Sequence, residues 1–340
     1  MTEIATSLPS TLVDRFGRQV TYVRMSITDR CDFRCVYCMD EEMTFMPRQR
    51  LLTLEEIVRL LQAFCELGVE KIRITGGEPL VRRNVDWLFQ QLGALKQRSG
   101  LKELTLTTNG SQLAKYADTL AHSGLDRVNI SLDTLRTDRF KALTRIGQLD
   151  TVLDGIAAAK RAGFKRIKLN AVIMKGRNDD EIIDLAEFAI ANGLDISYIE
   201  EMPLGHVTHS RGETYCSSDE VLTQLKTRFS LQPSVTTTGG PSRYYHVAGT
   251  DSRIGFISPH SHNFCDSCNR VRVTTEGRLL LCLGQEHSMD LRQVMRDHPN
   301  DSLRLKQAIV DAMAIKPEGH EFNIQQAQPI IFRHMSVTGG

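Results

Sequence analysis

The sequence predicts an α/β protein built on an open (β/α)6 barrel, a partial TIM-type barrel, with a C-terminal α+β segment closing its open side. Between residues 21 and 201, short β-prone runs alternate with longer segments of helical periodicity. Repeating βα units imply a parallel sheet. Six strands are too few for a complete eight-stranded barrel. After residue 201 the alternation stops, and a different pattern begins.

The expected strands are short and β-prone, and they cover residues 21–28, 71–75, 103–108, 127–132, 166–173 and 195–199. The clearest helix begins at Thr53, which forms a capping-box pattern with Glu56. Gly68 stands where a C-cap glycine ends a helix. Further helices are expected near residues 84–97, 112–122, 150–162 and 179–191, each between two of the strands.

We expect three parts in the chain: a flexible N-terminal extension (1–15), a partial barrel (16–235) and a C-terminal segment (236–340). Residues 204–215 have the polar composition of a loop, and residues 236–241 have that of a linker. The remaining expected elements are helices near 219–229, 291–297 and 302–315 and short strands near 253–258, 271–275 and 278–281.

Composition excludes several classes of function. The 340 residues contain 42 Lys and Arg against 41 Asp and Glu, so a net charge of +1 gives no global field for nucleic acid or membrane. No apolar run reaches the ~18 residues of a membrane span, and the N-terminus lacks the pattern of a secretory signal. We therefore expect a cytoplasmic protein. Eight cysteines in a reducing compartment indicate metal binding or catalysis instead of disulfides.

Three cysteines follow the first expected strand with C-x3-C-x2-C spacing: Cys31, Cys35 and Cys38. Closely spaced thiolates are the usual ligands of iron–sulfur clusters. Three protein ligands would leave one iron of a [4Fe-4S] cluster open, and an open position is where a substrate or cosubstrate binds. The alternative is a zinc or structural site, but zinc normally takes four ligands and the nearest histidine is His122.

A second group has C-x2-C-x13-C spacing: Cys265, Cys268 and Cys282. Spacing alone leaves a zinc site open here, with His287 as the fourth ligand. Arg270 and Arg272 flank Val271 in an expected strand, so their side chains point to one side. A planar guanidinium suits phosphate, although a solvated charge pair is the ordinary alternative.

Several candidate residues lie at the ends of the expected strands, where βα barrels place their catalytic groups. These residues are Cys31, Gly77, Glu78, Thr107, Ser131 and Met202. Taken singly, each is also an ordinary turn or core residue. Three cations, Arg24, Arg73 and Lys168, lie within strands. Facing inward, they would be costly to bury without anionic partners, so three on different strands favour a polyanionic substrate.

The C-x3-C-x2-C motif, with Tyr37 before its third cysteine, resembles the signature of radical S-adenosylmethionine (SAM) enzymes. One family within them, the GTP 3',8-cyclases of molybdenum cofactor biosynthesis, is closer still. The resemblance runs from about Phe16 to the last residue and rests on Thr-Asp-Arg-Cys31, Arg73-Ile-Thr-Gly-Gly-Glu-Pro79, Thr107-Thr-Asn-Gly110, Cys265-x2-Cys268-Asn-Arg-Val-Arg272 and the terminal Gly339-Gly340. One departure is Asp32, where many relatives have Asn.

The resemblance implies two [4Fe-4S] clusters, one on each cysteine group, and SAM as cosubstrate. It assigns SAM binding to Tyr37, Gly77, Glu78, Ser131 and Met202. It assigns GTP binding to Arg24, Arg73, Thr107, Lys168, Arg270, Val271 and Arg272. It also suggests that the tail, Gly339 and Gly340, reaches the active site, although a frayed end is typical of termini.

The activity implied is that of a lyase. Reductive cleavage of SAM gives a 5'-deoxyadenosyl radical, which takes the hydrogen from the ribose 3' carbon of GTP. The product would be (8S)-3',8-cyclo-7,8-dihydroguanosine 5'-triphosphate, the first step of molybdopterin synthesis. Implied partners are a flavodoxin- or ferredoxin-like electron donor and the cyclic pyranopterin monophosphate synthase that receives the product. A homodimer is one option that the sequence leaves open.

Two rival functions are weaker. The first is another radical SAM enzyme with an auxiliary cluster, such as a peptide-modifying one, and the Arg-Val-Arg stretch and terminal glycines argue against it. The second is a zinc-stabilised nucleotide- or RNA-binding module without catalysis, and the near-zero net charge weakens its RNA version. Cys65 on an apolar helix face and Cys216 in a polar loop receive no role.

Overall fold

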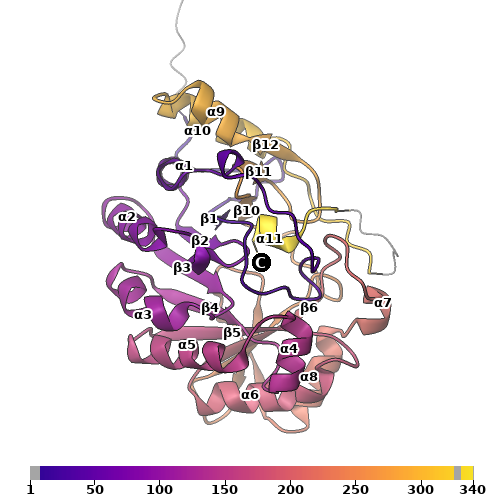
Figure 1. Ribbon diagram of the computed structural model, residues 1–340. Coiled ribbons are helices and arrows are strands. Elements are labelled where there is room, and N and C mark those ends of the chain that lie inside the picture. Colours follow the sequence, from indigo (N-terminus) through magenta and orange to yellow (C-terminus); the bar gives the residue numbers. More distant parts are fainter. Residues whose placement is uncertain (1–7, 325–330, 340) are drawn as a thin grey trace, which may run out of the picture.

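A curved sheet runs through the protein in a computed structural model that describes residues 8–324 and 331–339 (Figure 1). In the described residues the sheet has twelve strands, in the order β12-β11-β10-β1-β2-β3-β4-β5-β6-β9-β8-β7. Their bounds are β1 Tyr22–Ser26, β2 Lys71–Thr75, β3 Glu103–Thr108, β4 Arg127–Ser131, β5 Arg166–Ile173, β6 Asp195–Glu200, β7 Leu231–Ser234, β8 Arg243–Val247, β9 Arg253–Ile257, β10 Arg270–Val273, β11 Arg278–Leu280 and β12 Ser288–Asp290.

The centre of this sheet is parallel, from β10 through β1–β6 to β9. The six expected strands β1–β6 are confirmed, and β2, β3 and β5 have the expected bounds. The C-terminal segment adds β10 beside β1 and β9 beside β6, and each continues into an antiparallel hairpin. The sheet ends at β12 and β7, so it forms the open barrel that the sequence predicts.

Helices cover the outer side of the parallel strands, whereas α9 and α10 extend beyond α1 (Figure 1). The helices are α1 Leu54–Glu66, α2 Val85–Arg98, α3 Leu113–His122, α4 Thr137–Thr144, α5 Leu149–Arg161, α6 Ile182–Ala191, α7 Arg211–Thr214, α8 Ser218–Lys226, α9 Leu291–Asp297, α10 Ser302–Met313 and α11 Met335–Thr338. Single 3₁₀ turns occur at Arg48–Arg50, Pro79–Val81 and Asp179–Glu181. The capping box of α1 is confirmed, because Thr53 accepts from the Glu56 amide and Glu56 accepts from the Thr53 amide.

Six short elements were not predicted: α4, α7, α11, β7, β8 and β12. None of these strands exceeds five residues, and β7 contains Pro233, which weakens a strand signal. Helix α4 has no side-chain cap, and α7 is a single turn within the expected loop. These elements form because of contacts with other parts of the chain, such as the pairing of β8 with β9, and the local sequence pattern does not predict them.

The two faces of the parallel sheet differ in polarity. Apolar residues at alternate positions, such as Val23, Met25, Ile72 and Ile74, are fully buried and belong to the large core that includes the helix residues. The positions between them carry polar and basic side chains. In register, Arg24 of β1 pairs with Arg73 of β2 on one side and with Arg272 of β10 on the other. Alternation therefore turns a row of arginines toward the hollow of the barrel.

The described C-terminal residues end inside this hollow. Helix α11 contacts β1 and lies at the centre of the molecule, within the curve of the sheet (Figure 1). Gly339, which follows it, is buried. The last described residues therefore contribute to the interior of the barrel.

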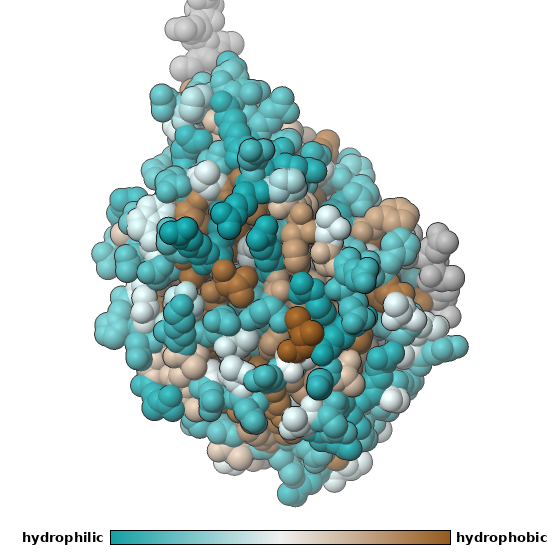
Figure 2. Space-filling view, viewed as in Figure 1, coloured by the Kyte–Doolittle hydropathy of each residue, from teal (hydrophilic) through white to brown (hydrophobic). Residues whose placement is uncertain are grey.

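Hydrophilic residues dominate the face seen in Figure 2, and the hydrophobic ones on it form small, separate groups. Across residues 8–324 and 331–339, every helix is too short or too polar to cross a bilayer.

We expect Gly255→Ala to destabilise the protein by about 1–3 kcal/mol, the usual cost of overpacking. Gly255 pairs with Ser197 where β9 joins β6, and an added Cβ would lie 2.3 Å from Ser242 Oγ and 2.6 Å from Ser197 Oγ. The measurement is the shift of the thermal unfolding midpoint. Gly100→Ala is the control, because a Cβ there meets open space and should leave the midpoint unchanged or slightly raised. Equal midpoints for both variants would contradict this account.

Candidate active site

One cavity occupies the hollow of the barrel, and both cysteine groups line it. Its wall includes Cys31, Cys35 and Cys38 from the N-terminal part of the chain. It also includes Cys265, Cys268 and Cys282 from the C-terminal part. Of the other predicted site residues, Tyr37, Gly77, Ser131, Met202, Arg24, Arg73, Thr107, Lys168, Arg270, Val271 and Arg272 also line it. The fold thus brings to one place residues as far apart in sequence as Arg24 and Cys282.

The first cysteine group lies in the loop that follows β1. The Cys31 sulfur accepts hydrogen bonds from the Phe33 amide at 3.3 Å and from Asn109 Nδ2 at 3.7 Å. Burial raises the pKa of the Cys38 thiol to about 12 and that of Cys35 well above its usual range. Bare thiolates are therefore unfavourable here, and a bound cation or cationic cluster is what would keep these sulfurs deprotonated. The donor set fits an iron–sulfur cluster.

The segment after β2 packs directly on this loop. The Gly77 amide donates to the Thr28 carbonyl at 2.7 Å, and a Cβ on Gly77 would lie 2.4 Å from the Arg30 carbonyl oxygen. Only glycine allows this approach. Glu78 is fully buried and does not line the cavity. Its carboxylate accepts from the amides of Leu80 (2.9 Å) and Asn109 (2.6 Å) and from the Thr108 hydroxyl (2.8 Å), so in this structure it holds the loops together.

The Tyr37 hydroxyl donates to Asp133 Oδ2 at 2.7 Å, and Asp133 Oδ1 accepts from the Val172 amide at 2.8 Å. Burial raises the pKa of Asp133 to about 6. Asp133 follows β4 by two residues and was not assigned a role from the sequence. It fixes the ring of Tyr37 at the first cysteine group. Ser131 and Met202 lie on the same cavity wall, at the ends of β4 and β6.

The second cysteine group lies on the loops that flank β10 and β11. The Cys268 amide donates to the Cys265 carbonyl at 3.0 Å. Burial alone would raise the pKa of the Cys268 thiol. The positive charges of Arg270 and Lys316 outweigh this effect, so the pKa lies below its ordinary value. His287 is exposed and lines a separate surface hollow, so it is not placed as the fourth ligand of a zinc site.

Nowhere in the described parts of the chain do three Cys, His, Asp or Glu side chains converge closely enough to hold a single metal ion. A mononuclear zinc site needs such convergence, because each Zn–S bond is about 2.3 Å long. The cysteines of an iron–sulfur cluster each bind a different iron, so they need not converge on one point.

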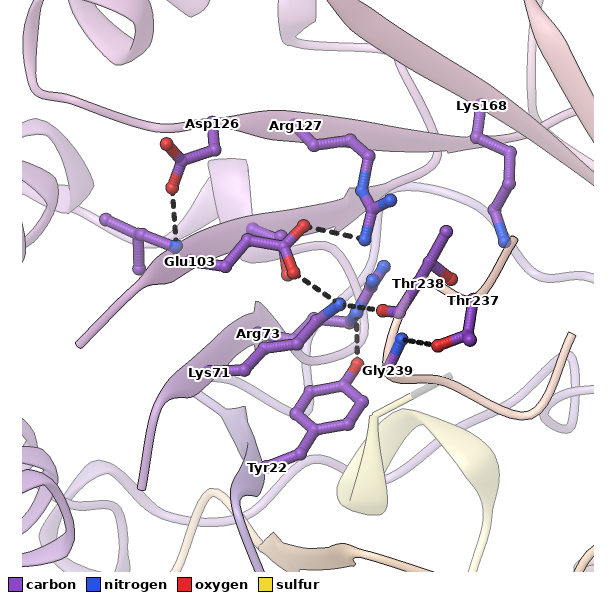
Figure 3. Close-up of polar contacts among 12 residues, drawn as sticks. Tyr22, Lys71, Arg73, Glu103, Asp126, Arg127, Lys168, Thr237, Thr238 and Gly239 are labelled. Carbon is purple, nitrogen blue, oxygen red and sulfur yellow. Dashed lines mark hydrogen bonds and ion pairs between the residues drawn. The ribbon is translucent and has the colours of Figure 1, made fainter. Parts of the chain in front are cut away.

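Basic side chains from neighbouring strands form the floor of the cavity (Figure 3). Arg73 Nε donates to the Tyr22 hydroxyl at 2.5 Å, and its Nη1 donates to Thr107 Oγ1 at 3.0 Å. Lys168 Nζ lies 3.4 Å from the Tyr244 hydroxyl. Two further cations pair with Glu103, which accepts from Lys71 at 2.6 Å and from Arg127 at 2.7 Å (Figure 3).

These cations raise one another's electrostatic energy. Burial, and then the charges of Arg24 and Arg270, lower the pKa of Arg272 well below its usual range. Burial also lowers the pKa of Lys168. At Tyr22, burial raises the pKa, but the charges of nearby Arg73, Arg24 and Lys71 outweigh it and lower the value to about 7. A polyanionic ligand would relieve this repulsion, and a triphosphate has that character.

The end of the described chain joins the same floor. Arg272 Nη1 donates a hydrogen bond to the Gly339 carbonyl. Gly339 has a φ of +79°, and an added Cβ would lie 2.1 Å from Thr75 Cγ2. Glycine is therefore required there on both conformational and steric grounds. Gly340 lies outside the described residues.

Several polar residues of this region received no role from the sequence, among them Tyr22, Lys71, Asn109, Arg127 and Asp133. A signal for Tyr22 and Lys71 was present, because each stands two residues before an arginine of its strand and so faces the same side. Asn109 and Asp133 act through loop contacts that no spacing in the sequence indicates.

Two families match the chain. The radical SAM superfamily matches residues 25–189, and the family described as Molybdenum Cofactor Synthesis C matches residues 194–322. Among solved structures, the fold is similar to the crystal structure of Streptococcus suis SuiB bound to S-adenosylmethionine, with a TM-score of 0.60 and 18% identity over 94% of this chain and 76% of that chain. At this identity the likeness shows the fold alone.

Curated relatives are much closer in sequence. The GTP 3',8-cyclase of Saccharophagus degradans is 58% identical over 97% of this chain and 99% of its own length. The GTP 3',8-cyclase of Ectopseudomonas mendocina is 58% identical over 97% and 98%, and GTP 3',8-cyclase 2 of Pseudomonas aeruginosa is 57% identical over 97% and 99%. Identity of this extent, with both family matches, shows that the chain belongs to the GTP 3',8-cyclase family of the radical SAM superfamily.

Proposed function

We propose that this protein is a GTP 3',8-cyclase, a lyase that converts GTP to (8S)-3',8-cyclo-7,8-dihydroguanosine 5'-triphosphate and so begins molybdopterin synthesis. The observation that supports this most directly is a cavity lined by both cysteine groups and by basic side chains. A cysteine group that only binds a cluster does not need basic side chains around it. A radical reaction on a nucleoside triphosphate needs both cysteine groups and the basic side chains in one place.

At one end of the cavity, Cys31, Cys35 and Cys38 would hold the first cluster. When bound, a [4Fe-4S] cluster there supplies the electron that cleaves SAM to methionine and a 5'-deoxyadenosyl radical. Tyr37, Gly77, Ser131 and Met202 line the adjoining wall and would orient SAM; Glu78 holds the loop on which Gly77 lies. The contact expected between Glu78 and the SAM amino group stays a prediction.

At the other end, Cys265, Cys268 and Cys282 would hold a second [4Fe-4S] cluster with an open iron facing the guanine. Arg24, Arg73, Thr107, Lys168 and the Arg270–Val271–Arg272 stretch would bind the triphosphate. This arrangement presents the ribose, and hence its 3' hydrogen, to the SAM end of the cavity. The apolar part of the wall would keep water from the radical.

The electron donor is proposed to be a flavodoxin- or ferredoxin-like protein, and the product is proposed to pass to cyclic pyranopterin monophosphate synthase. A cytoplasmic location and a homodimer complete the proposal. The direct test is anaerobic incubation of the reconstituted protein with GTP, SAM and dithionite, followed by mass spectrometry. We expect equimolar 5'-deoxyadenosine and the cyclised nucleotide; 5'-deoxyadenosine without consumption of GTP would overturn the substrate assignment.

Iron content should report both clusters. Anaerobically purified protein is expected to contain about eight iron atoms per chain, and the triple variant of Cys265, Cys268 and Cys282 to alanine about four, because each triad binds one [4Fe-4S] cluster. Cys65→Ala is the matched control, since that thiol lies on the apolar face of α1. About four iron atoms and one zinc in the unmodified protein would instead indicate a structural C-terminal site.

Lys168→Met should weaken GTP binding by roughly 10- to 150-fold, because a hydrogen bond to a charged group contributes about 1.5–3 kcal/mol. The measurement is the dissociation constant for GTP by calorimetry, with iron content unchanged. Lys102→Met removes an exposed lysine that pairs with Glu70 at the surface and should leave the constant unaltered. Equal effects of the two substitutions would count against a triphosphate on the cavity floor.

Deletion of Gly339 and Gly340 should abolish cyclisation of GTP while leaving iron content and SAM cleavage intact. The reason is the contact of Gly339 with Arg272 and its tight fit against Thr75. Product formation and 5'-deoxyadenosine release, measured together, separate the two effects. Turnover equal to that of the full-length protein would rule out a role for the tail.

A further inference from the structure

We propose that Lys316 is a positioning residue for the second cysteine group: a buried cation beside Cys268 that raises the reduction potential of the cluster bound there. This inference rests on the proposed function only in requiring a cluster on Cys265, Cys268 and Cys282. Lys316 follows α10 and was not singled out in the sequence.

Lys316 is only 1% exposed. Its ammonium nitrogen lies 3.8 Å from Cys268 Sγ and 3.9 Å from Asp14 Oδ2. Burying an ammonium group without partners is costly, so these two contacts account for its position. One partner is a cluster ligand, which places a full positive charge beside the sulfur. Lys316 does not line the cavity, so it is not a contact for GTP.

Asp14 and Arg18 fix this lysine from the N-terminal segment. Asp14 Oδ2 accepts from Arg18 Nε at 2.7 Å. Arg18 in turn donates to the Cys265 carbonyl at 2.8 Å, to the Pro317 carbonyl at 2.6 Å and to the Glu318 carbonyl. The N-terminal segment, the Cys265–Cys268 loop and the residues after α10 are thereby joined around one network of charges.

The residues that follow Lys316 continue along the same cysteine group. A Cβ on Gly319 would lie 3.3 Å from Cys265 Sγ. A Cβ on Gly284, two residues after Cys282, would lie 2.7 Å from the His320 Cβ. The segment 316–320 therefore passes beside Cys265 and Cys268 and beside Gly284, and Lys316 is its positively charged residue next to a cysteine sulfur.

The effect on a cluster follows from charge. A [4Fe-4S] cluster with three thiolates becomes more negative when reduced, and nearby positive charge favours that reduced form. The charged groups that face Cys268 are Lys316 and Arg270, with Asp14 and Arg18 behind the lysine. Removing Lys316 should thus lower the reduction potential, and neutralising Asp14 should raise it.

The experiment uses the full chain with Cys31, Cys35 and Cys38 changed to alanine, so that iron reports the second group alone. After anaerobic reconstitution with iron and sulfide, the potential is measured by redox titration followed by electron paramagnetic resonance. We expect Lys316→Met to shift the reduction equilibrium at least tenfold toward the oxidised form, which is 59 mV for one electron. Asp14→Asn should shift it the opposite way, and Lys316→Arg should stay near the parent.

Opposite shifts of the reduction potential in Lys316→Met and Asp14→Asn are the decisive result, because damage to the fold alone would not shift the potential in opposite directions. If Lys316→Met does not retain iron, retention by Lys316→Arg supports the inference, and loss from both overturns it. An unchanged potential in Lys316→Met, or a shift in the same direction from Asp14→Asn, also overturns it. An iron-free parent would instead refute the second cluster, and with it that part of the proposed function.

Discussion

The alternation of side chains along parallel strands is the constraint on which this structure depends. Each central strand turns its apolar residues outward, where helices bury them, and its polar or basic residues inward. Stability therefore comes from the outer layer, and the interior is free to hold charge. Like charges buried together, such as those of Arg73 and Lys168, are costly, and an anionic ligand would offset that cost. The same geometry that builds the sheet thus defines what can bind inside it.

The C-terminal segment adds a parallel strand at each edge of the β1–β6 sheet, β10 beside β1 and β9 beside β6, and so supplies the remaining residues of the cavity wall. Strand β10 places Arg272 beside Arg24, and β1 places Arg24 beside Arg73, so residues almost 250 positions apart form one row. The hairpins beyond β10 and β9 extend the sheet without joining each other, and the barrel stays open. A closed eight-stranded barrel fills its interior with side chains. An open sheet leaves a cavity in its hollow, and α11 contributes Met335 to the wall of that cavity.

Sequence reasoning was strongest where local pattern and burial agree. Strands β2, β3 and β5 pair with a neighbouring strand on each side, and their β-prone runs end where the strands end. It was weakest where contacts distant in sequence decide the structure. Strand β8 exists because β9 is beside it, and Asp133 matters because Tyr37 reaches it across 96 positions. Both cysteine groups were recognised by spacing, whereas the Asp14–Lys316 pair has no sequence pattern at all.

Asp32 stands where the family resemblance leads one to expect asparagine, and its surroundings suit a carboxylate. Its carboxylate accepts from Asn109 Nδ2 at 2.8 Å, Ser111 Oγ at 2.7 Å and Gln112 Nε2 at 3.1 Å. An asparagine would direct its NH2 group at some of these donors, so the neighbours here match an acid. The added charge has a consequence for chemistry. Burial, and after it the charges of Glu78 and Asp32, raise the pKa of the Cys31 thiol. A Cys31 thiolate is therefore costly in this loop, chiefly because of burial, and a bound cationic cluster would offset that cost.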